Sequence, residues 1–198
     1  MANIASFSFD PITITTQEGQ IFTTDILMYS GSEPVISSDV MISYNPEVLT
    51  PITDGASDIR PGDFFQITDA KILSPGKMYI YAINQSPSQS KAANGKLATI
   101  SFRARKAGST ELRFDCIPFQ KQTSQIITND PDLTNIINCT TTRAHSSTVL
   151  IEAGNNVLGA STQKPYQTWY VGLAILFAIF AGVLYFRYKR LSQHLKTS

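Results

Sequence analysis

The stretch LATISFRARKAGSTELRFDC, residues 97–116, decides the fold class of this chain. In its first half Ile100 and Phe102 alternate with polar residues, and in its second half Leu112 and Phe114 do the same. A period of two is typical of β-strands that bury one face. The short turn KAGST between the two halves favours an antiparallel hairpin whose apolar residues face the core.

The same alternation extends on both sides of this stretch, from Ala5 to Glu152. Pro11 interrupts the first run, so we expect a bent or broken first strand. Asn94-Gly95 predicts a tight turn, and residues 47–63 are expected to be irregular. Further strands are expected in FTTDILMYS (22–30), SSDVMISYN (37–45), MYIYAIN (78–84), around Ile126 and in STVLIE (147–152), with Phe64, Phe65 and Ile67 in a short strand or loop. About eight or nine short strands without an amphipathic helix predict an all-β, two-sheet sandwich.

A different pattern begins at WYVGLAILFAIFAGVLYF, residues 169–186, which contains no charge and no proline. As a helix these residues would be about 27 Å long, close to the hydrocarbon thickness of a bilayer. Aromatic residues stand at both ends, where membrane helices meet the interfaces. The alternative is a buried core helix, but an all-apolar surface leaves a small domain nothing to expose to water. The sequence therefore predicts one C-terminal transmembrane α-helix.

The residues that flank this span predict its direction. Arg187, Lys189, Arg190 and Lys196 follow it, whereas Lys164 is the one basic residue between Glu152 and the span. By the positive-inside rule the C-terminus is cytoplasmic and the N-terminal domain lies outside the cell. We therefore expect an extracellular domain at 1–152, a linker at 153–168, the membrane span at 169–186 and a basic cytoplasmic tail at 187–198.

An outside domain has to be exported, yet the opening MANIASFSFDP has neither the basic nor the apolar region of a signal peptide. We expect that the export signal was removed or lies outside this sequence; a cytosolic domain on a tail anchor is the alternative. Covalent attachment to a cell wall is a second alternative. It also uses an apolar span and a basic tail, but STQKPYQT stands where an LPxTG-like motif would be.

Composition excludes some functions and leaves the cysteines open. The tail holds four of the 16 basic residues and none of the 15 acidic ones, so the rest of the chain is slightly acidic. An acidic domain is not expected to bind nucleic acid. Cys116 and Cys139 are the two cysteines; in an oxidising compartment such a pair can form a disulfide, and two separate buried thiols are the alternative. His145 and His194 fall on opposite sides of the predicted membrane, so no Cys/His metal site and no cofactor are expected.

Catalytic groupings are equally weak. Asp54, Asp58 and Asp63 stand in a Gly- and Pro-rich loop, where acidic residues commonly stabilise turns, rather than at the fixed separation that glycoside hydrolysis needs. His145 is the single histidine of the outer domain, and there is no GxSxG-like elbow for a nucleophilic serine. We therefore expect a protein that is not an enzyme.

The order of several motifs resembles the cohesin domain family over nearly all of residues 5–152. Tyr44, Asn45 and Leu49 stand where the family has a tyrosine, an Asp or Asn and a leucine. The motifs are ASFSFDP, FTTDILMYSG, VMISYNPEVL, GKMYIYAIN, GKLATISFRARKAGSTELRF and the closing VLIE. The resemblance implies a nine-stranded jelly-roll β-sandwich, related in fold to a group of cellulose-binding modules.

The resemblance also implies a function. Cohesins bind dockerin-bearing proteins, commonly polysaccharide-degrading enzymes, through one of their two sheets. That sheet would hold the strands SSDVMISYN, MYIYAIN, LATISFRAR and the one near Ile126. The first three of these strands would point their partner-binding residues outward: Asp39, Met41, Ser43, Tyr79, Tyr81, Thr99, Ser101 and Arg103. Exposed tyrosines and an arginine are typical of binding hot spots, although a plain solvated sheet is the alternative. Two other functions stay open: binding of a polysaccharide, as in the related modules, and a structural stalk without a soluble ligand.

Overall fold

The computed structural model describes residues 5–53, 59–118, 120 and 122–154. They all lie within one compact unit. The predicted span at 169–186, the tail and nearly all of the predicted linker therefore lie outside the described residues. Within the described ranges, no helix is long and apolar enough to cross a membrane.

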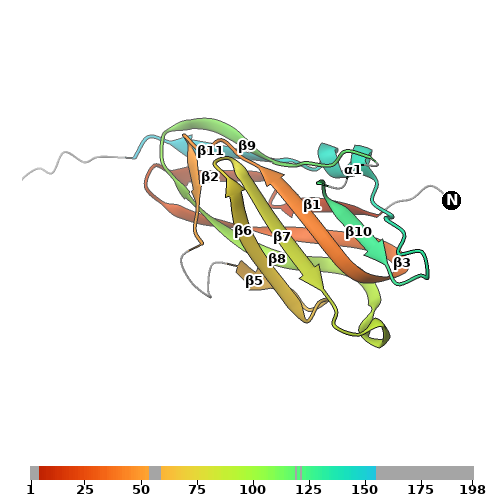
Figure 1. The fold of residues 1–198 in the computed structure, drawn as a ribbon. Helices are drawn as coiled ribbons and strands as arrows, with labels where there is room; N and C mark the ends of the chain where they lie inside the picture. The colour runs from red at the N-terminus through yellow and green to blue at the C-terminus, as the bar shows by residue number, and fades with distance from the viewer. Residues whose placement is uncertain (1–4, 54–58, 119, 121, 155–198) are drawn as a thin grey trace, which may run out of the picture. The chain divides into compact units, whose positions relative to one another are not determined.

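The described unit is built from strands, as the alternation predicted, and the expectation of an all-β sandwich is confirmed (Figure 1). A six-residue helix, α1 (Cys139–Ala144), and a 3-10 turn at Pro87–Gln89 are the helical elements described. The strands are β1 (Ser6–Asp10), β2 (Thr13–Gln17), β3 (Ile21–Ser43), β4 (Leu49–Pro51), β5 (Ile59–Pro61), β6 (Ile67–Ser74), β7 (Lys77–Ile83), β8 (Lys91–Ala104), β9 (Gly108–Phe114), β10 (Gln125–Thr128) and β11 (Ser147–Glu152).

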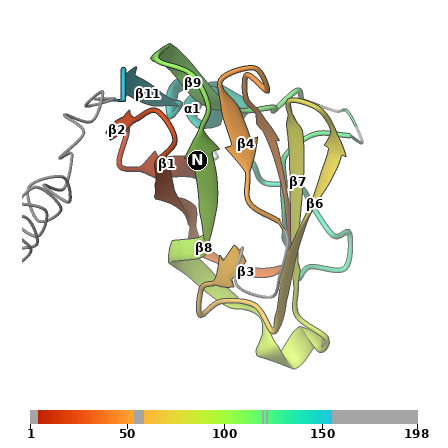
Figure 2. The same cartoon turned by 90° about the vertical axis from the view of Figure 1, so that its left-hand side faces the viewer.

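Strand β3 organises both layers of the sandwich. Its first half, residues 21–29, pairs with β1 and β8, and β8 continues to β4 and β5. Its second half, residues 35–43, pairs with β7 on one side and β10 on the other, and β7 continues to β6. Figure 2 shows the pair β6 and β7 standing opposite β8 and β1. Because one strand serves both layers, the hydrogen-bonded sheet is continuous around the core.

A third group of strands connects the layers at one side. β11 pairs in parallel with β2 and antiparallel with β9, and β9 joins β3 where Phe114 lies opposite Ile42. The apolar residues that alternate along these strands meet between the layers. Phe9 and Phe114 stack with ring centroids 4.1 Å apart, and the fully buried Ile42, Ile80 and Phe102 belong to the same core cluster.

The strand count differs from the nine expected, because eleven strands are formed among the described residues. The first strand divides into β1 and β2 around Pro11, as the sequence suggested. The strands expected at 22–30 and 37–45 merge into β3. β4, β5 and the eight-residue β6 lie where irregular chain or a short strand was expected.

The hairpin predicted from residues 97–116 is wrong, although both of its strands exist. β8 bonds to β3 along one edge and to β4 and β5 along the other, so it has no edge left for β9. β9 pairs instead with β11 and, at its end, with the second half of β3. The tight turn predicted at Asn94-Gly95 is also wrong, because both residues lie inside β8.

Candidate functional site

The outward side of β10, the second half of β3, β7 and β6 forms a four-strand face. The register places Asp39 opposite Tyr81, and Met41 opposite Tyr79. The neighbouring strands extend these rows to β6 and β10. The residues of the four-strand face are Ser37, Asp39, Met41 and Ser43 of β3, Lys77, Tyr79 and Tyr81 of β7, Asp69 and Lys71 of β6, and Gln125 and Ile127 of β10.

Two tyrosines at the centre of this face are held in place by carboxylates. The Tyr79 hydroxyl donates to Asp39 Oδ1 at 2.6 Å, and the Tyr81 hydroxyl donates to Asp69 Oδ2 at 3.2 Å. The two rings lie 6.1 Å apart between centroids, and Lys71 Nζ lies 5.2 Å from the Tyr79 ring. The aromatic rings are therefore oriented before any partner arrives, which lowers the entropy that binding costs.

The environment of the tyrosines fixes their protonation. Burial, and then the hydrogen bond and negative charge of Asp39, raise the pKa of Tyr79. The charge of Asp69, and then its hydrogen bond, raise the pKa of Tyr81. Both phenols are protonated at neutral pH, as tyrosines ordinarily are, and act as hydrogen-bond donors; the raised pKa extends this state to higher pH. Such groups suit recognition rather than proton transfer, because a general base works best with a pKa near the operating pH.

A shallow depression of about 270 Å³ lies beside Tyr79 on this face. Met41 and Leu73 give it an apolar part, and Asp39 and Lys71 give it charge of both signs. An apolar centre with charged residues near it is the usual composition of a protein-binding hot spot.

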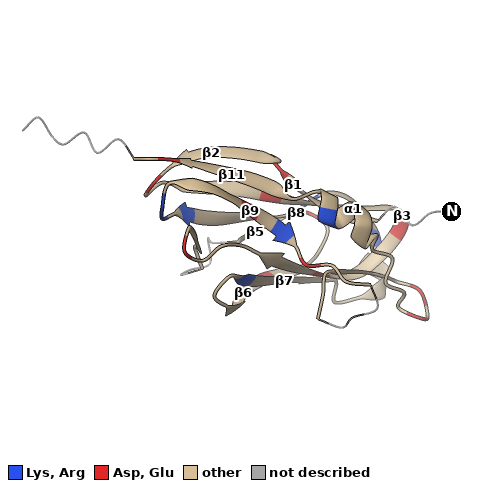
Figure 3. Ribbon diagram, turned by 90° about the horizontal axis from the view of Figure 1, so that it is seen from above, with Lys and Arg blue, Asp and Glu red and all other residues tan. Residues whose placement is uncertain are grey.

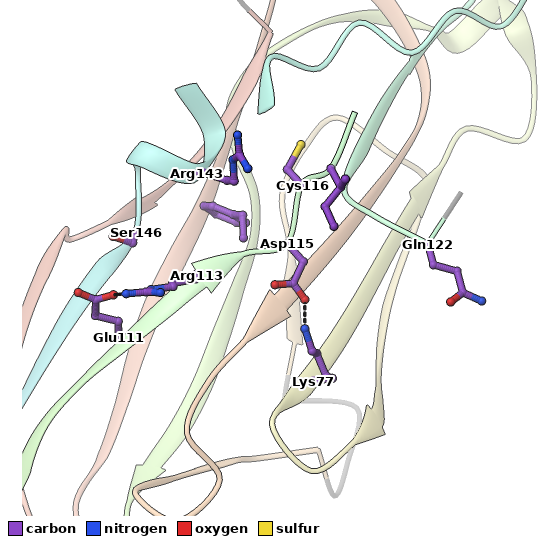
Figure 4. A pocket seen from close by; sticks show the side chains of 10 residues that line it. Lys77, Glu111, Arg113, Asp115, Cys116, Gln122, Arg143 and Ser146 are labelled. Atoms are coloured by element: carbon purple, nitrogen blue, oxygen red, sulfur yellow. Dashed lines mark hydrogen bonds and ion pairs between the residues drawn. The ribbon is translucent and has the colours of Figure 1, made fainter. Parts of the chain in front are cut away.

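A larger polar hollow, of about 550 Å³, lies next to one end of the four-strand face (Figure 4). Its two acids are paired: Asp115 with Lys77, and Glu111 with Arg113. Asp115 also accepts a hydrogen bond from Ser43 at 2.6 Å. These interactions tie the start of β7 to the ends of β3 and β9, so we assign this cluster a structural role.

Cys116, one of the two cysteines, lies on the wall of that hollow. The Sγ atoms of Cys116 and Cys139 are 2.03 Å apart and form a disulfide, which is the first of the two alternatives considered above. It joins the chain after β9 to the first residue of α1. Among the described residues, no three His, Cys, Asp or Glu side chains are grouped so that they could hold a metal ion. His145 faces the Phe7 carbonyl, with its Nδ1 at 3.2 Å from that oxygen.

Charge is distributed over both layers rather than gathered on one side (Figure 3). Basic segments are seen on β6, β9 and α1, separated by uncharged ribbon. A partner would therefore be recognised by a local pattern of side chains, not by a single-sign field.

The structure brings together five of the eight predicted partner-binding residues. Asp39, Met41, Ser43, Tyr79 and Tyr81 all lie on the four-strand face. The other three lie on β8 in the opposite layer, so the prediction that one face holds all eight is wrong.

The three residues of β8 have structural contacts of their own. Thr99 is 7% exposed and donates a hydrogen bond to Asp25 Oδ1. Ser101 lies opposite Thr23, and Arg103 Nη1 donates to the Gly19 carbonyl at 3.3 Å. The sequence could not separate these residues from the others, because alternation shows which side of a strand points out but not which layer the strand joins.

Sequence reasoning missed several members of the four-strand face. Asp69 and Lys71 were overlooked because β6 was expected to be a short strand or loop. Pro75-Gly76 was a usable signal, since it forms the turn of a β6–β7 hairpin, with Gly76 at φ +85°. Ser37, Lys77, Gln125 and Ile127 complete the missed residues.

Comparisons with known proteins agree with this architecture. The cohesin domain family model matches residues 9–143. A comparison with curated protein sequences gives no match.

Several solved cohesins share the fold at low sequence identity. The sixth cohesin of scaffoldin B from Acetivibrio cellulolyticus, solved with a mutant Cel5 dockerin, has a TM-score of 0.55 and 15% identity over 75% of this chain and 99% of that one. The OlpA cohesin of Clostridium thermocellum, solved with the dockerin Doc918, has a TM-score of 0.54 and 12% identity over 74% and 99%. The cohesin module of a family 33 glycoside hydrolase from Clostridium perfringens has a TM-score of 0.54 and 14% identity over 75% and 97%.

The family model spans more than half of the chain, and its range holds β3, β7 and β10 of the four-strand face together with nearly all of the sandwich. The chain belongs to the cohesin domain family.

Proposed function

We propose that this chain is a cell-surface module, without enzymatic activity, that binds a dockerin-type protein through its four-strand face. Family membership supports the class of partner, and two of the similar cohesins were solved with dockerins bound. The observation that carries the choice of face is the pair of tyrosines fixed by Asp39 and Asp69 beside Met41.

A polysaccharide is the second candidate ligand, favoured by the neighbouring rings of Tyr79 and Tyr81. The two ring planes are inclined by 28° to each other, and both hydroxyls are already bound to carboxylates. A sugar chain would need a flatter platform with free polar groups at its rim. We therefore favour a protein partner over a sugar chain. The partners of cohesins are commonly enzymes that degrade polysaccharide, and we propose a partner of this kind here.

We further propose that the domain is exported and held at the membrane by residues 169–186, with the basic tail in the cytoplasm. The apolar run and the positive charges after it support the anchor and its direction. The Cys116–Cys139 disulfide supports an oxidising compartment for the domain.

The test is direct binding of the full-length chain, in detergent, to purified dockerin-bearing proteins encoded in the same genome. We expect the double variant Asp39→Ala, Tyr79→Ala to weaken binding by about 100-fold, because it removes the centre of the face. The matched control is Ser101→Ala, Arg103→Ala on the opposite layer, which should stay within about twofold of the unchanged chain.

Retention on insoluble polysaccharides is measured in parallel. If the control pair weakens dockerin binding and the Asp39, Tyr79 pair does not, the choice of face is wrong. If no dockerin binds and a polysaccharide retains the chain in a Tyr79-dependent way, the second candidate replaces the first.

A further inference from the structure

The outer edge of β6 is one of the two edges of the four-strand face. β6 pairs with β7 along one side. Along the other side no strand among the described residues is hydrogen-bonded to it, although β5 lies close by. Ile72 and Leu73 near its end are 37% and 48% exposed. An open edge of this kind is a template for pairing with another strand.

The direction of the main-chain groups on β6 follows from bonds elsewhere in the same layer. Tyr44 N–H donates to the Gly76 carbonyl at 3.0 Å, and Asn84 N–H donates to the Ile36 carbonyl at 2.9 Å. The even-numbered residues of β7 therefore bond to β3, and its odd-numbered residues bond to β6. Because Tyr81 lies opposite Asp69, the even-numbered residues of β6 point their main-chain groups at the open edge.

One contact on that edge agrees with this direction. Ala70 N–H donates to the side chain of its own neighbour, Asp69 Oδ1, at 2.8 Å, instead of to a strand. The main-chain N–H and C=O groups of Thr68, Ala70 and Ile72 thus form the open edge of the strand. One of them, the Ala70 N–H, is hydrogen-bonded to the Asp69 side chain. A pairing strand could take over that bond while Asp69 keeps its contact with Tyr81 through Oδ2.

The sequence of this edge is complementary to itself when reversed. If two copies of ITDAKILS run antiparallel with Ala70 opposite Ala70, Asp69 of each copy lies opposite Lys71 of the other. Thr68 then lies opposite Ile72. Charges on an edge strand normally repel a neighbouring edge or leave it unpaired. Here the two charges would attract the same edge of a second copy and would discriminate against other strands.

We propose that two copies of this chain associate through their β6 edges, with a two-fold axis passing between the two Ala70 residues. Ala70 would exchange both main-chain hydrogen bonds with its counterpart, and the two Asp69–Lys71 pairs would lie on the outward side. The four-strand faces of the two copies would then continue into each other as one eight-strand sheet. The pairing itself does not rest on the proposed function.

The expected association is weak. Leu73 lies at a break in the β6–β7 register, which limits the regular edge to about five residues. One strand pair buries well under the roughly 1,200 Å² of a stable interface, so we expect a dissociation constant on the order of 0.1 mM. Confinement of the chain to a membrane surface would raise its local concentration and favour the dimer.

The test is sedimentation equilibrium of the full-length chain in detergent with charge-reversal variants. We expect Asp69→Lys alone and Lys71→Asp alone to weaken self-association at least tenfold, because like charges would then lie opposite each other. An equimolar mixture of the two variants should restore association to within about threefold of the unchanged chain, because each Lys then meets an Asp. The matched control, Lys106→Asp between β8 and β9, should not change association.

The mixture keeps the experiment decisive even if one variant is less stable, because restored association requires both variants to be folded. Thermal unfolding of each variant is recorded alongside. The proposal is overturned if the chain stays monomeric at 1 mM, if the single variants associate like the unchanged chain, or if the mixture fails to restore association. No dockerin is present, so the result is independent of the partner proposed above.

Discussion

At the scale of single residues, the Asp39–Tyr79 pair links the stability of the four-strand face to pH. Burial, and then the Asp39 carboxylate, raise the pKa of Tyr79 above its ordinary value of about 10. A group whose pKa is raised in the folded state contributes stability that is fully present below its unfolded pKa. That stability is lost as pH rises through the folded pKa.

We therefore expect Tyr79→Phe to lower the free energy of unfolding by about 1 kcal/mol at pH 7, because it removes a hydrogen bond to a partly buried carboxylate. The unchanged chain should lose stability more steeply than the variant above about pH 10. Urea unfolding at pH 7 and pH 11 measures both effects. Tyr81→Phe is the control: its 3.2 Å bond is on the exposed surface, so its effect at pH 7 should be smaller.

Thr99 and Lys96 hold the Asp25 carboxylate in the layer opposite the four-strand face. Burial by itself would raise the pKa of Asp25, but hydrogen bonds from Lys96 and Thr99 and the charge of Lys96 lower it. A lowered pKa contributes stability above the ordinary value of about 3.9 that is lost as pH falls through the folded pKa.

Thr99→Val keeps the shape of the side chain and removes the hydroxyl that donates to Asp25. It should cost about 1 kcal/mol of unfolding free energy at pH 7 and progressively less below about pH 4. Dockerin binding should stay unchanged, since β8 lies in the layer opposite the four-strand face. A binding loss without a stability loss would return Thr99 to the partner-binding residues.

At the scale of elements, the disulfide fastens the chain after β9 to the start of α1. It closes a loop with a sequence separation of 23 residues between Cys116 and Cys139. In the chain-entropy account a loop of this length contributes about 3 kcal/mol. We expect a reductant to lower the unfolding free energy of the unchanged chain by about that amount, measured by guanidinium titration.

The control for this prediction is the double variant Cys116→Ser, Cys139→Ser. It should start near the stability of the reduced chain and should not respond to reductant. An unchanged chain that shows the same midpoint with and without reductant would contradict a bonded pair in solution.

The elements also show how far the sequence alone reaches. Alternation predicted the buried sides of β3 and β7 correctly, because side chains on a strand alternate wherever the strand lies. It failed at the β8–β9 hairpin, because pairing depends on edges that distant strands already occupy. The same limit explains the site: Asp39 and Tyr79 were placed on one face correctly, whereas Thr99 and Arg103 were assigned to the wrong layer.

At the scale of the whole molecule, β3 connects the two layers of the sandwich. Its first half belongs to one layer and its second half to the other, so the two layers share one continuous strand. β11 ends the described fold at Glu152, and the predicted linker starts one residue later. A domain of this kind is expected to stay folded when the chain is cut beyond it.

That expectation allows the proposed orientation to be tested on intact cells. Lys164 is the one basic residue between Glu152 and the apolar span, but Pro165 follows it and blocks cleavage by trypsin. The test therefore uses the variant Pro165→Ala, in which trypsin can cleave after Lys164. If the domain lies outside, trypsin added to intact cells should release it folded into the medium, while an epitope at the C-terminus stays with the cells. The unchanged chain is the control: it should be released much more slowly, because Pro165 blocks the cleavage site while the domain is the same. If the domain survives untouched until the cells are broken, while a known surface protein is digested in the same sample, the outside orientation is wrong and a surface partner is excluded with it.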